Sequence, residues 1–383
     1  MKYLVVRCED VAPGAERLAP LLEGAKLTHL HELAQAGAGG LCRLQQRSPA
    51  GWTDRFFLHQ ALLGLAPGDA TPPAGRCYAE SAQMPVEAGQ TAWCCDLITQ
   101  RDGIVVDPTA GHVTTKESAL LIEAIQGVLG SDVRRWQVGD GSHHLLLASG
   151  HDLDRESGRG LPATELLVGD AWEPHVPRGV AGAALRAVLE EASGILDRHP
   201  VNRVRVDLGE NPANGIWLWG PGTGGMQRTF VDRTGLSGAV ISSNFLVRGL
   251  AKALNLAWYT GPTSWEERSL DATTRSVTKL LPGCDFIYVH LVVASTDPVE
   301  RLCAMERLDQ GLLKTCTDAL PRQGPWRLLV AVDDRTQGVV PFIAAGTDVP
   351  RHPAVSLERA AFAGSPLSFV DGTGWFAWLT TAS

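Results

Sequence analysis

The sequence predicts an α/β protein: a parallel β-sheet flanked by helices, with a smaller α+β domain inserted into it. The sheet is predicted by short apolar segments at residues 238–243, 256–261, 284–293 and 326–334, which alternate with helical segments such as 299–320. Apolar strands separated by helices are typical of a parallel sheet that is covered on both faces. Such sheets place functional side chains at the carboxyl ends of their strands.

The start of the chain follows the same alternation of strand and helix. Residues 2–10 form a short apolar segment that ends in acidic residues. In residues 26–44, Leu27, Leu30 and Leu33 recur at helical spacing before glycines end the helix and a second strand begins.

Two stretches rich in proline and glycine, 65–76 and 169–179, enclose a region with a different pattern. Within it, residues 91–108 indicate two strands joined by an Arg-Asp-Gly turn. We therefore expect an inserted α+β domain within a core domain. The expected division is 1–72 and 170–383 for the core domain and 73–169 for the insert.

The composition limits the class of function. The net charge of -8 argues against a partner with a phosphate backbone, because nucleic-acid binding requires a basic surface. No apolar stretch approaches the roughly 18 residues that a membrane-spanning helix requires, and the N-terminus meets charge too early for a secretory signal. We expect a cytoplasmic protein without a membrane or nucleic-acid partner.

Five segments together resemble the archaeal-type cofactor-independent phosphoglycerate mutases, a branch of the alkaline phosphatase superfamily. The segments are 97–125, 199–222, 235–251, 285–291 and 339–346. The resemblance implies an alkaline-phosphatase-like parallel sheet with an inserted smaller domain. It also implies the interconversion of 3- and 2-phosphoglycerate through a phosphoserine, at two Mn²⁺ or Mg²⁺ ions.

The metal ligands that the resemblance implies are only partly present. Where the family has an aspartate at the end of the first strand, this chain has Glu9 and Asp10. Where the family has a P-D-H-P-T motif, the chain keeps Asp333 and has Asp334 at the histidine position. The loops that carry the family's other ligands are shortened or absent. The sequence therefore predicts one divalent cation (Mn, Mg or Zn) at most, held by these four carboxylates, or none.

The two acidic strand ends are expected to lie together. If strands 2–10 and 326–334 are neighbours in a parallel sheet, Asp333 and Asp334 face the same cleft as Glu9 or Asp10. Carboxylates so close to one another need a cation, a basic side chain such as Arg7, or protonation. A solvated, turn-capping acidic pair remains the alternative for residues 333 and 334.

The candidate nucleophile is a threonine. The family's serine lies in a G-S-D motif before an apolar helix, and the nearest match here is Thr53 followed by Asp54. Thr53 could attack phosphorus, but the spacing to the following Leu-Leu-Gly is two residues longer than the family pattern. A threonine that caps the helix explains the same residues equally well.

Four basic side chains are candidates for substrate binding. Arg248 keeps the position of a basic residue in the family, and His143 stands about where the family has an arginine that contacts phosphate. Arg203 and Arg205 could bind an anion, although retention for packing explains their segment as well. The family's aspartate just before the Leu-Val-Arg-Gly segment that contains Arg248 is Phe245 here.

Two functions compete on these observations. One is a phosphoglycerate-mutase-like enzyme with a degenerate two-metal centre and low or altered activity on a small phosphate ester or phosphonate. The other is a catalytically inactive pseudoenzyme that binds a ligand or a protein partner. Bound metal distinguishes the two.

Overall fold

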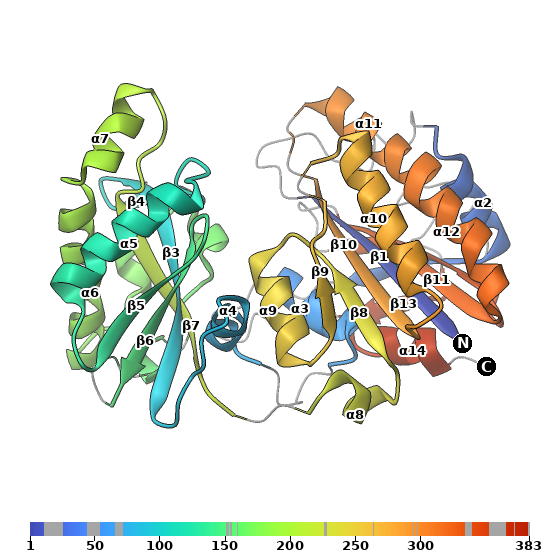
Figure 1. Ribbon diagram of the computed structural model, residues 1–383, viewed down its shortest axis with the longest axis horizontal. Helices are drawn as coiled ribbons and strands as arrows, with labels where there is room; N and C mark the ends of the chain where they lie inside the picture. The colour runs from blue at the N-terminus through green and yellow to red at the C-terminus, as the bar shows by residue number, and fades with distance from the viewer. Residues whose placement is uncertain are drawn as a thin grey trace.

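The computed structural model describes residues 1–10, 26–43, 54–65, 72–150, 153, 155–158, 160–225, 228–262, 264–293, 295, 297–333, 339–351, 365–370 and 372–381. Two β-sheets, each with its own helices, stand next to each other (Figure 1). We call them, with their helices, the core unit and the second unit. None of the helices in these ranges is both long enough and apolar enough to cross a membrane.

The core unit contains an eight-stranded sheet in which the first strand of the chain is central. The order is β13 (Ser368–Val370), β2 (Ala38–Arg43), β12 (Val339–Gly346), β11 (Trp326–Asp333), β1 (Lys2–Asp10), β10 (Phe286–Val293), β8 (Gly238–Ile241) and β9 (Ala257–Tyr259). β1 pairs in parallel with β10 and β11, and the parallel pairing continues to β8 and β9. β12 is antiparallel to its two neighbours. The predicted α/β class with a parallel-rich sheet is confirmed.

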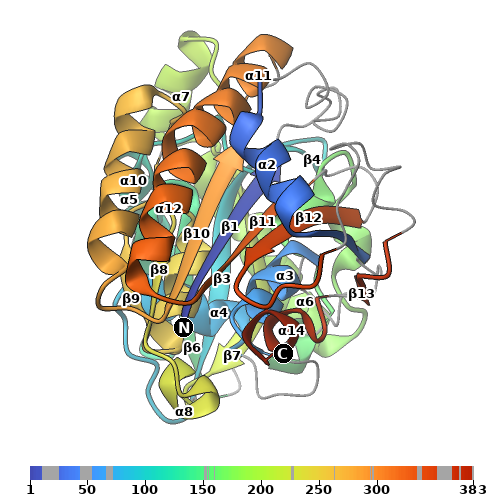
Figure 2. The same ribbon diagram turned by 90° about the vertical axis from the view of Figure 1, so that its right-hand side faces the viewer.

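Helices cover both faces of this sheet (Figure 2). Alternate residues of β1 point to opposite faces, so Leu4 and Val6 enter one apolar cluster and Tyr3 and Val5 enter the other. One face is covered by α2 (Thr28–Ala36), α10 (Glu267–Leu280), α11 (Pro298–Arg307), the π-helical turn η4 (Leu308–Leu313) and α12 (Lys314–Ala319). The other face is covered by α3 (Asp54–Leu62), α8 (Phe230–Thr234), α9 (Phe245–Ala253) and α14 (Trp375–Thr381).

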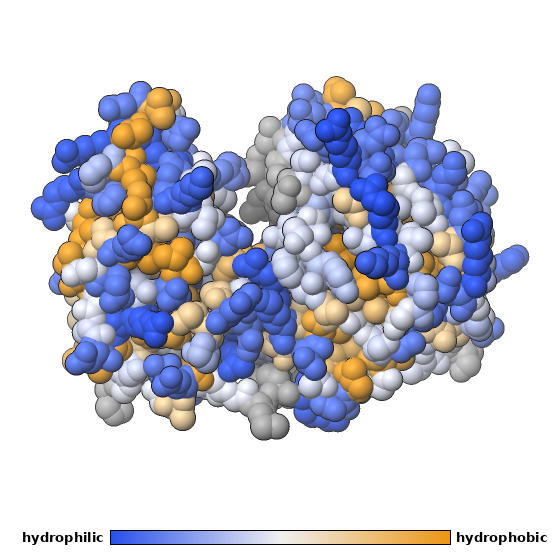
Figure 3. Space-filling view, in the orientation of Figure 1, coloured by the Kyte–Doolittle hydropathy of each residue, from blue (hydrophilic) through white to orange (hydrophobic). Residues whose placement is uncertain are grey.

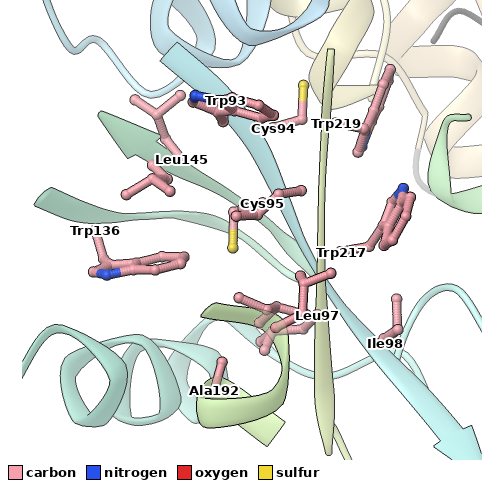
Figure 4. Close-up of a cluster of buried hydrophobic side chains, with 14 of the residues drawn as sticks. Trp93, Cys94, Cys95, Leu97, Ile98, Trp136, Leu145, Ala192, Trp217 and Trp219 are labelled. Atoms are coloured by element: carbon pink, nitrogen blue, oxygen red, sulfur yellow. The ribbon is translucent and has the colours of Figure 1, made fainter. Parts of the chain in front are cut away.

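The second unit is built on a five-stranded sheet. Its strands are β3 (Gln90–Arg101), β4 (Ile104–Asp107), β5 (Arg134–Asp140), β6 (His143–Ser149) and β7 (Gly215–Thr223), and its helices are α4 (Ala74–Ser81), α5 (Thr115–Leu129), α6 (Val180–Leu196) and α7 (Pro200–Asp207). Trp93, Trp136 and Trp217 fill its core (Figure 4).

The division of the chain at residues 72 and 169 stays a prediction. The first boundary falls at the described segment that leads into α4. β7 lies beyond residue 169 and pairs with β3 along most of its length. We therefore propose that the second unit extends to about residue 223.

The two units meet through α4 and α9, which touch backbone to backbone. A side chain at Gly249 on α9 would place its Cβ only 1.8 Å from the carbonyl oxygen of Cys77 on α4. On the other side of α4, a Cβ at Gly75 would lie 2.0 Å from the carbonyl oxygen of Ala92 on β3. Glycine at both positions lets α4 pack tightly between the core unit and the second sheet.

The start of α2 is capped by a side chain distant in sequence. Its own N-cap residue, Leu27, offers no side-chain acceptor. Asp309, which is buried in the π-helical turn, instead accepts hydrogen bonds from the backbone N–H groups of Leu30 at 2.7 Å and His29 at 3.2 Å. One carboxylate thus satisfies two of the donors that a helix leaves open at its first turn.

Asp309→Ala should lower the free energy of unfolding by about 1–3 kcal/mol, because it leaves buried donors without an acceptor. Urea denaturation measures the change. Asp271→Ala, at an exposed position on α10, is the matched control and should change stability by less than about 0.5 kcal/mol. Equal effects in the two variants would contradict the capping role.

Candidate functional site

Four buried titratable or charged side chains gather near the carboxyl ends of β1 and β10: Arg7, Glu9, His59 and His290. Arg7 and Glu9 are two residues apart on β1 and share a face, and the strand register sets Arg7 beside His290. His59 enters from α3, which covers this face. The register of two strands and the packing of one helix therefore create the group.

The carboxylate of Glu9 is the centre of this cluster. Its Oε2 lies 2.8 Å from His290 Nε2 and 3.4 Å from His59 Nε2. The Nη2 of Arg7 lies 3.9 Å from the same oxygen. A carboxylate this deeply buried requires such partners, because an uncompensated charge is expensive in the interior.

Hydroxyl groups fix the orientation of both imidazole rings. His59 Nδ1 lies 2.7 Å from the hydroxyl of Tyr288, and His290 Nδ1 lies 3.0 Å from Oγ of Ser242. Both Nε2 atoms therefore point at Glu9. Burial, with the positive charge of Arg7 next in importance, holds the pKa of His59 well below its usual range, so this ring is neutral.

The donor set of the cluster fits one divalent cation. The two imidazole nitrogens and the carboxylate oxygen lie within 4.8 Å of one another. Two histidines and a carboxylate are ligands that Zn²⁺ and related ions accept, and hydroxyl partners on the far ring nitrogens are the usual outer support of such ligands. Within the ranges that the structure describes, no second group of three such side chains comes this close.

The carboxylates predicted as metal ligands are only partly covered by the structure. Glu9 belongs to the cluster, and the backbone of Asp333 is paired with that of Glu9 across β11 and β1, so the predicted adjacency of the two acidic strand ends is confirmed. The backbone of Asp10 continues β1 beside Val293. The side chains of Asp10 and Asp333, together with all of Asp334, lie outside the described part of the chain. Their roles as ligands stay predictions.

The predicted nucleophile also falls outside the described residues. Thr53 immediately precedes α3, whose first described residue is Asp54. Its role stays a prediction.

A second buried carboxylate, Asp96, lies on β3 of the second unit. Its Oδ1 accepts hydrogen bonds from the Tyr78 hydroxyl and from His143 Nδ1, both at 2.9 Å. Its Oδ2 accepts from the Thr164 hydroxyl and, at 2.7 Å, from the indole nitrogen of Trp219. Burial alone would raise the pKa of Asp96, but the bonds and charge of His143 outweigh it and lower the pKa.

Phe245 of the core unit brings two of the predicted substrate-binding residues to one place. Its ring lies 5.8 Å from the ring of His143, in a stacked arrangement, and 5.0 Å from that of Tyr78. The guanidinium carbon of Arg248 lies 4.8 Å from the same ring. Arg248 Nε also donates to Oγ of Ser81 at 2.5 Å. His143 and Arg248 therefore meet where the two units join.

The surface is hollowed next to this junction. In Figure 3 a notch separates the two lobes above the region where α4 and α9 lie in Figure 1.

Arg203 and Arg205 lie on α7, at the far end of the second unit (Figure 1). Arg203 is exposed. Arg205 is buried, and each of its guanidinium nitrogens donates within the unit, to the carbonyl oxygens of Ala110, Gly111 and Asn211 and to the carboxylates of Glu117 and Glu210. The structure does not bring these two arginines to His143 and Arg248, and their role in binding stays a prediction.

Four residues of these clusters were missed in the sequence: His59, His290, Asp96 and Tyr78. Asp96 carried a usable signal, because a lone carboxylate within an apolar strand must be paired if the strand is buried. The two histidines stand in apolar helical and strand segments. A single polar residue in such a segment does not indicate which other side chains it will meet.

Comparison with known proteins identifies relatives of the whole chain. A family model described as 2,3-bisphosphoglycerate-independent phosphoglycerate mutase matches residues 35–202. The chain is 28% identical over 371 residues to the protein of that name from Methanosarcina mazei, covering 91% of this chain and 92% of the relative. It is 31% identical over 309 residues to 2,3-bisphosphoglycerate-independent phosphoglycerate mutase 2 from Methanothermobacter thermautotrophicus, covering 78% of this chain and 75% of the relative.

Two solved structures share the fold. The cofactor-independent phosphoglycerate mutase from Thermoplasma acidophilum aligns with a TM-score of 0.58 at 23% identity and covers 99% of both chains. A protein from Pyrococcus horikoshii aligns with a TM-score of 0.69 at 17% identity, covering 99% of this chain and 96% of that one.

The pair of Asp96 and His143 should stabilise the protein most between about pH 4 and pH 6.5. The lowered pKa of Asp96 gives stability above about pH 4 that is lost as the pH falls through its folded pKa. Burial acts to lower the pKa of His143, but the hydrogen bond and charge of Asp96 outweigh burial, so the pKa is raised. The stability that His143 contributes is therefore complete below about pH 6.5 and is lost as the pH rises through its folded pKa.

Urea unfolding of wild type and Asp96→Asn over a series of pH values tests this window. The difference in free energy of unfolding should be largest inside it and shrink on both sides. Asp132→Asn, at an exposed position, is the control and should show no such window. A difference for Asp96→Asn that does not change with pH would refute the ion pair.

Proposed function

The chain belongs to the 2,3-bisphosphoglycerate-independent phosphoglycerate mutase family, and from this premise we propose that it transfers a phosphoryl group within a small phosphate ester or phosphonate at a single divalent cation. The family relationship supports a small phosphorylated substrate. The cluster of Glu9, His59 and His290 is the observation that carries the proposal of one ion.

The proposed ligands are the Nε2 atoms of His59 and His290 and a carboxylate oxygen of Glu9. A divalent cation bound there would supply charge neutralisation for a phosphoryl group and activation of a nucleophile. Tyr288 and Ser242 hold the two rings in the orientation that this binding requires. Asp333 and Asp10 are further candidate ligands, because their backbone lies beside the cluster.

The residues across the junction would bind the rest of the substrate. Arg248 carries a fixed positive charge that suits a carboxylate or phosphate, and the stacked Phe245 holds its guanidinium group in place. We propose His143 as its partner in this role, since its side chain is 33% exposed.

A catalytically inactive protein that binds a ligand or protein partner is the second candidate, and one observation favours it. Arg7 is fully buried and lies 3.9 Å from the oxygen that a metal would use. Its guanidinium group can neutralise Glu9 in place of an ion. Three ligands and an arginine would then form a closed network without a cation.

Elemental analysis after dialysis against excess Zn²⁺ or Mn²⁺ separates the two functions. We expect one equivalent of metal per chain, and its loss in Glu9→Gln and in His290→Asn. Glu123→Gln, at an exposed site on α5, is the control and should keep the ion. No metal in the wild type under these conditions would favour the arginine-neutralised, inactive protein.

Turnover of 3-phosphoglycerate should be far below the ordinary enzymatic range of roughly 1 to 10³ per second. A single ion forgoes several kcal/mol of transition-state stabilisation that a second would give, and each 1.36 kcal/mol is about tenfold in rate. A coupled assay with the metal-loaded protein measures this rate. A turnover number inside the ordinary range would show that one ion does not limit the chemistry.

A further inference from the structure

The contacts of His143 differ from those of a simple anion-binding side chain. Its Nδ1 donates to the buried carboxylate of Asp96 and lies 2.9 Å from the Tyr78 hydroxyl. A third of its side chain is nevertheless exposed. Within the described residues Nε2 forms no hydrogen bond, so it is the ring nitrogen that a ligand could contact.

Asp96 is arranged to keep this ring charged. The carboxylate accepts four hydrogen bonds, which only the ionised form can do in this geometry. The ion pair with His143 is the one salt bridge that Asp96 forms among the described residues. A histidine held by a buried carboxylate through Nδ1 is oriented and tuned to exchange a proton at Nε2.

The turn between β8 and α9 connects this pair to the Glu9 cluster. Ser242, just after β8, contacts His290 of the cluster, and Phe245, at the start of α9, stacks on His143. Phe245 is three positions after Ser242, so their backbones are at most about 11 Å apart. One short turn therefore carries a contact to each of the two groups.

We propose that His143, held by Asp96, donates a proton to the substrate oxygen that loses the phosphoryl group and accepts the proton of the substrate hydroxyl that then receives it. This inference rests on the proposed function, since it assigns a proton-transfer group to that reaction. It goes beyond anion binding, which needs only a positive charge at this position.

The proton balance of the step is simple. As the phosphorus–oxygen bond of the ester breaks and the phosphoryl group passes to a protein hydroxyl, whose own proton goes to solvent, the leaving alkoxide takes the proton from Nε2. The imidazole becomes neutral and keeps its Nδ1–H bond to Asp96. In the return step the neutral Nε2 takes the proton of the attacking substrate hydroxyl as the new phosphorus–oxygen bond forms, and the released protein alkoxide takes a proton from solvent.

Several charged or titratable groups face His143 from the elements packed around it. They are Asp96 on β3, Tyr78 on α4, Asp140 on β5, Glu165 on the turn η2 (Thr164–Leu167), His144 on β6 itself and, through Phe245, Arg248 on α9. The acidic groups favour the protonated ring, and their summed effect exceeds that of burial, so the pKa of His143 is raised.

Two phosphate esters with different leaving groups test the role. 3-Phosphoglycerate releases a basic alkoxide that needs a proton, whereas 4-nitrophenyl phosphate releases a stable phenolate that does not. We expect His143→Gln to lower kcat on 3-phosphoglycerate by about 10² to 10⁴-fold and on 4-nitrophenyl phosphate by less than about tenfold. His143→Arg, which keeps the charge, should restore KM but not kcat on 3-phosphoglycerate.

A pH profile gives a second readout that a purely structural role would not change. Removing the negative charge in Asp96→Asn should shift the alkaline limb of kcat on 3-phosphoglycerate to lower pH. His175→Gln, at an exposed position of the same unit, is the control, and circular dichroism checks that each variant is folded.

Equal losses on both esters in His143→Gln, or a wild-type kcat in His143→Arg, would overturn the proton-transfer role and leave the proposed function intact. A wild-type protein that turns over neither ester, with metal bound, would overturn the proposed function itself and this inference with it.

Discussion

The burial of one carboxylate on the central strand, β1, governs the core unit. Glu9 stands on β1 with β10 and β11 on either side, where an unpaired charge would cost several kcal/mol. Its compensation comes from β1 itself, from β10 and from α3, through Arg7, His290 and His59. The same strand register and helix packing that bury the apolar core therefore also set the charge of the site. The same Glu9 oxygen lies near the Arg7 guanidinium group and near both imidazole rings.

The second unit repeats this arrangement with different elements. Asp96 is buried in β3, and its partner His143 comes from β6. The two carboxylate–histidine pairs differ in access, since His290 is fully buried while His143 reaches the surface. The inner pair is suited to holding an ion or a fixed charge, and the outer pair to exchanging a proton. Phe245, from the core unit, stacks on His143, so the outer pair lies where the two units join.

The local sequence pattern was sufficient to predict the strands of the core unit, but not the residues of the candidate site. The apolar segments of β1, β8, β10 and β11 predicted the parallel sheet, because burial on both faces leaves a continuous apolar run. Glu9 could be found because an acid ends such a strand. His59 and His290 could not, since their meeting depends on how α3 is rotated over the sheet and on the register of β10, which no segment specifies alone. The pairing of β7 with β3 was equally hidden, because more than a hundred residues separate the two strands.

The backbone contact between α4 and α9 depends on one small residue, Gly249, which therefore indicates whether the two helices can pack this closely. Gly249 leaves no space for a side chain against Cys77. A homologue with alanine or a larger residue at this position has to hold the two helices further apart, and with them Phe245 from Tyr78 and His143. Reading this single position in a new sequence therefore indicates whether the outer histidine can be sheltered by the aromatic ring, before any catalytic residue is compared.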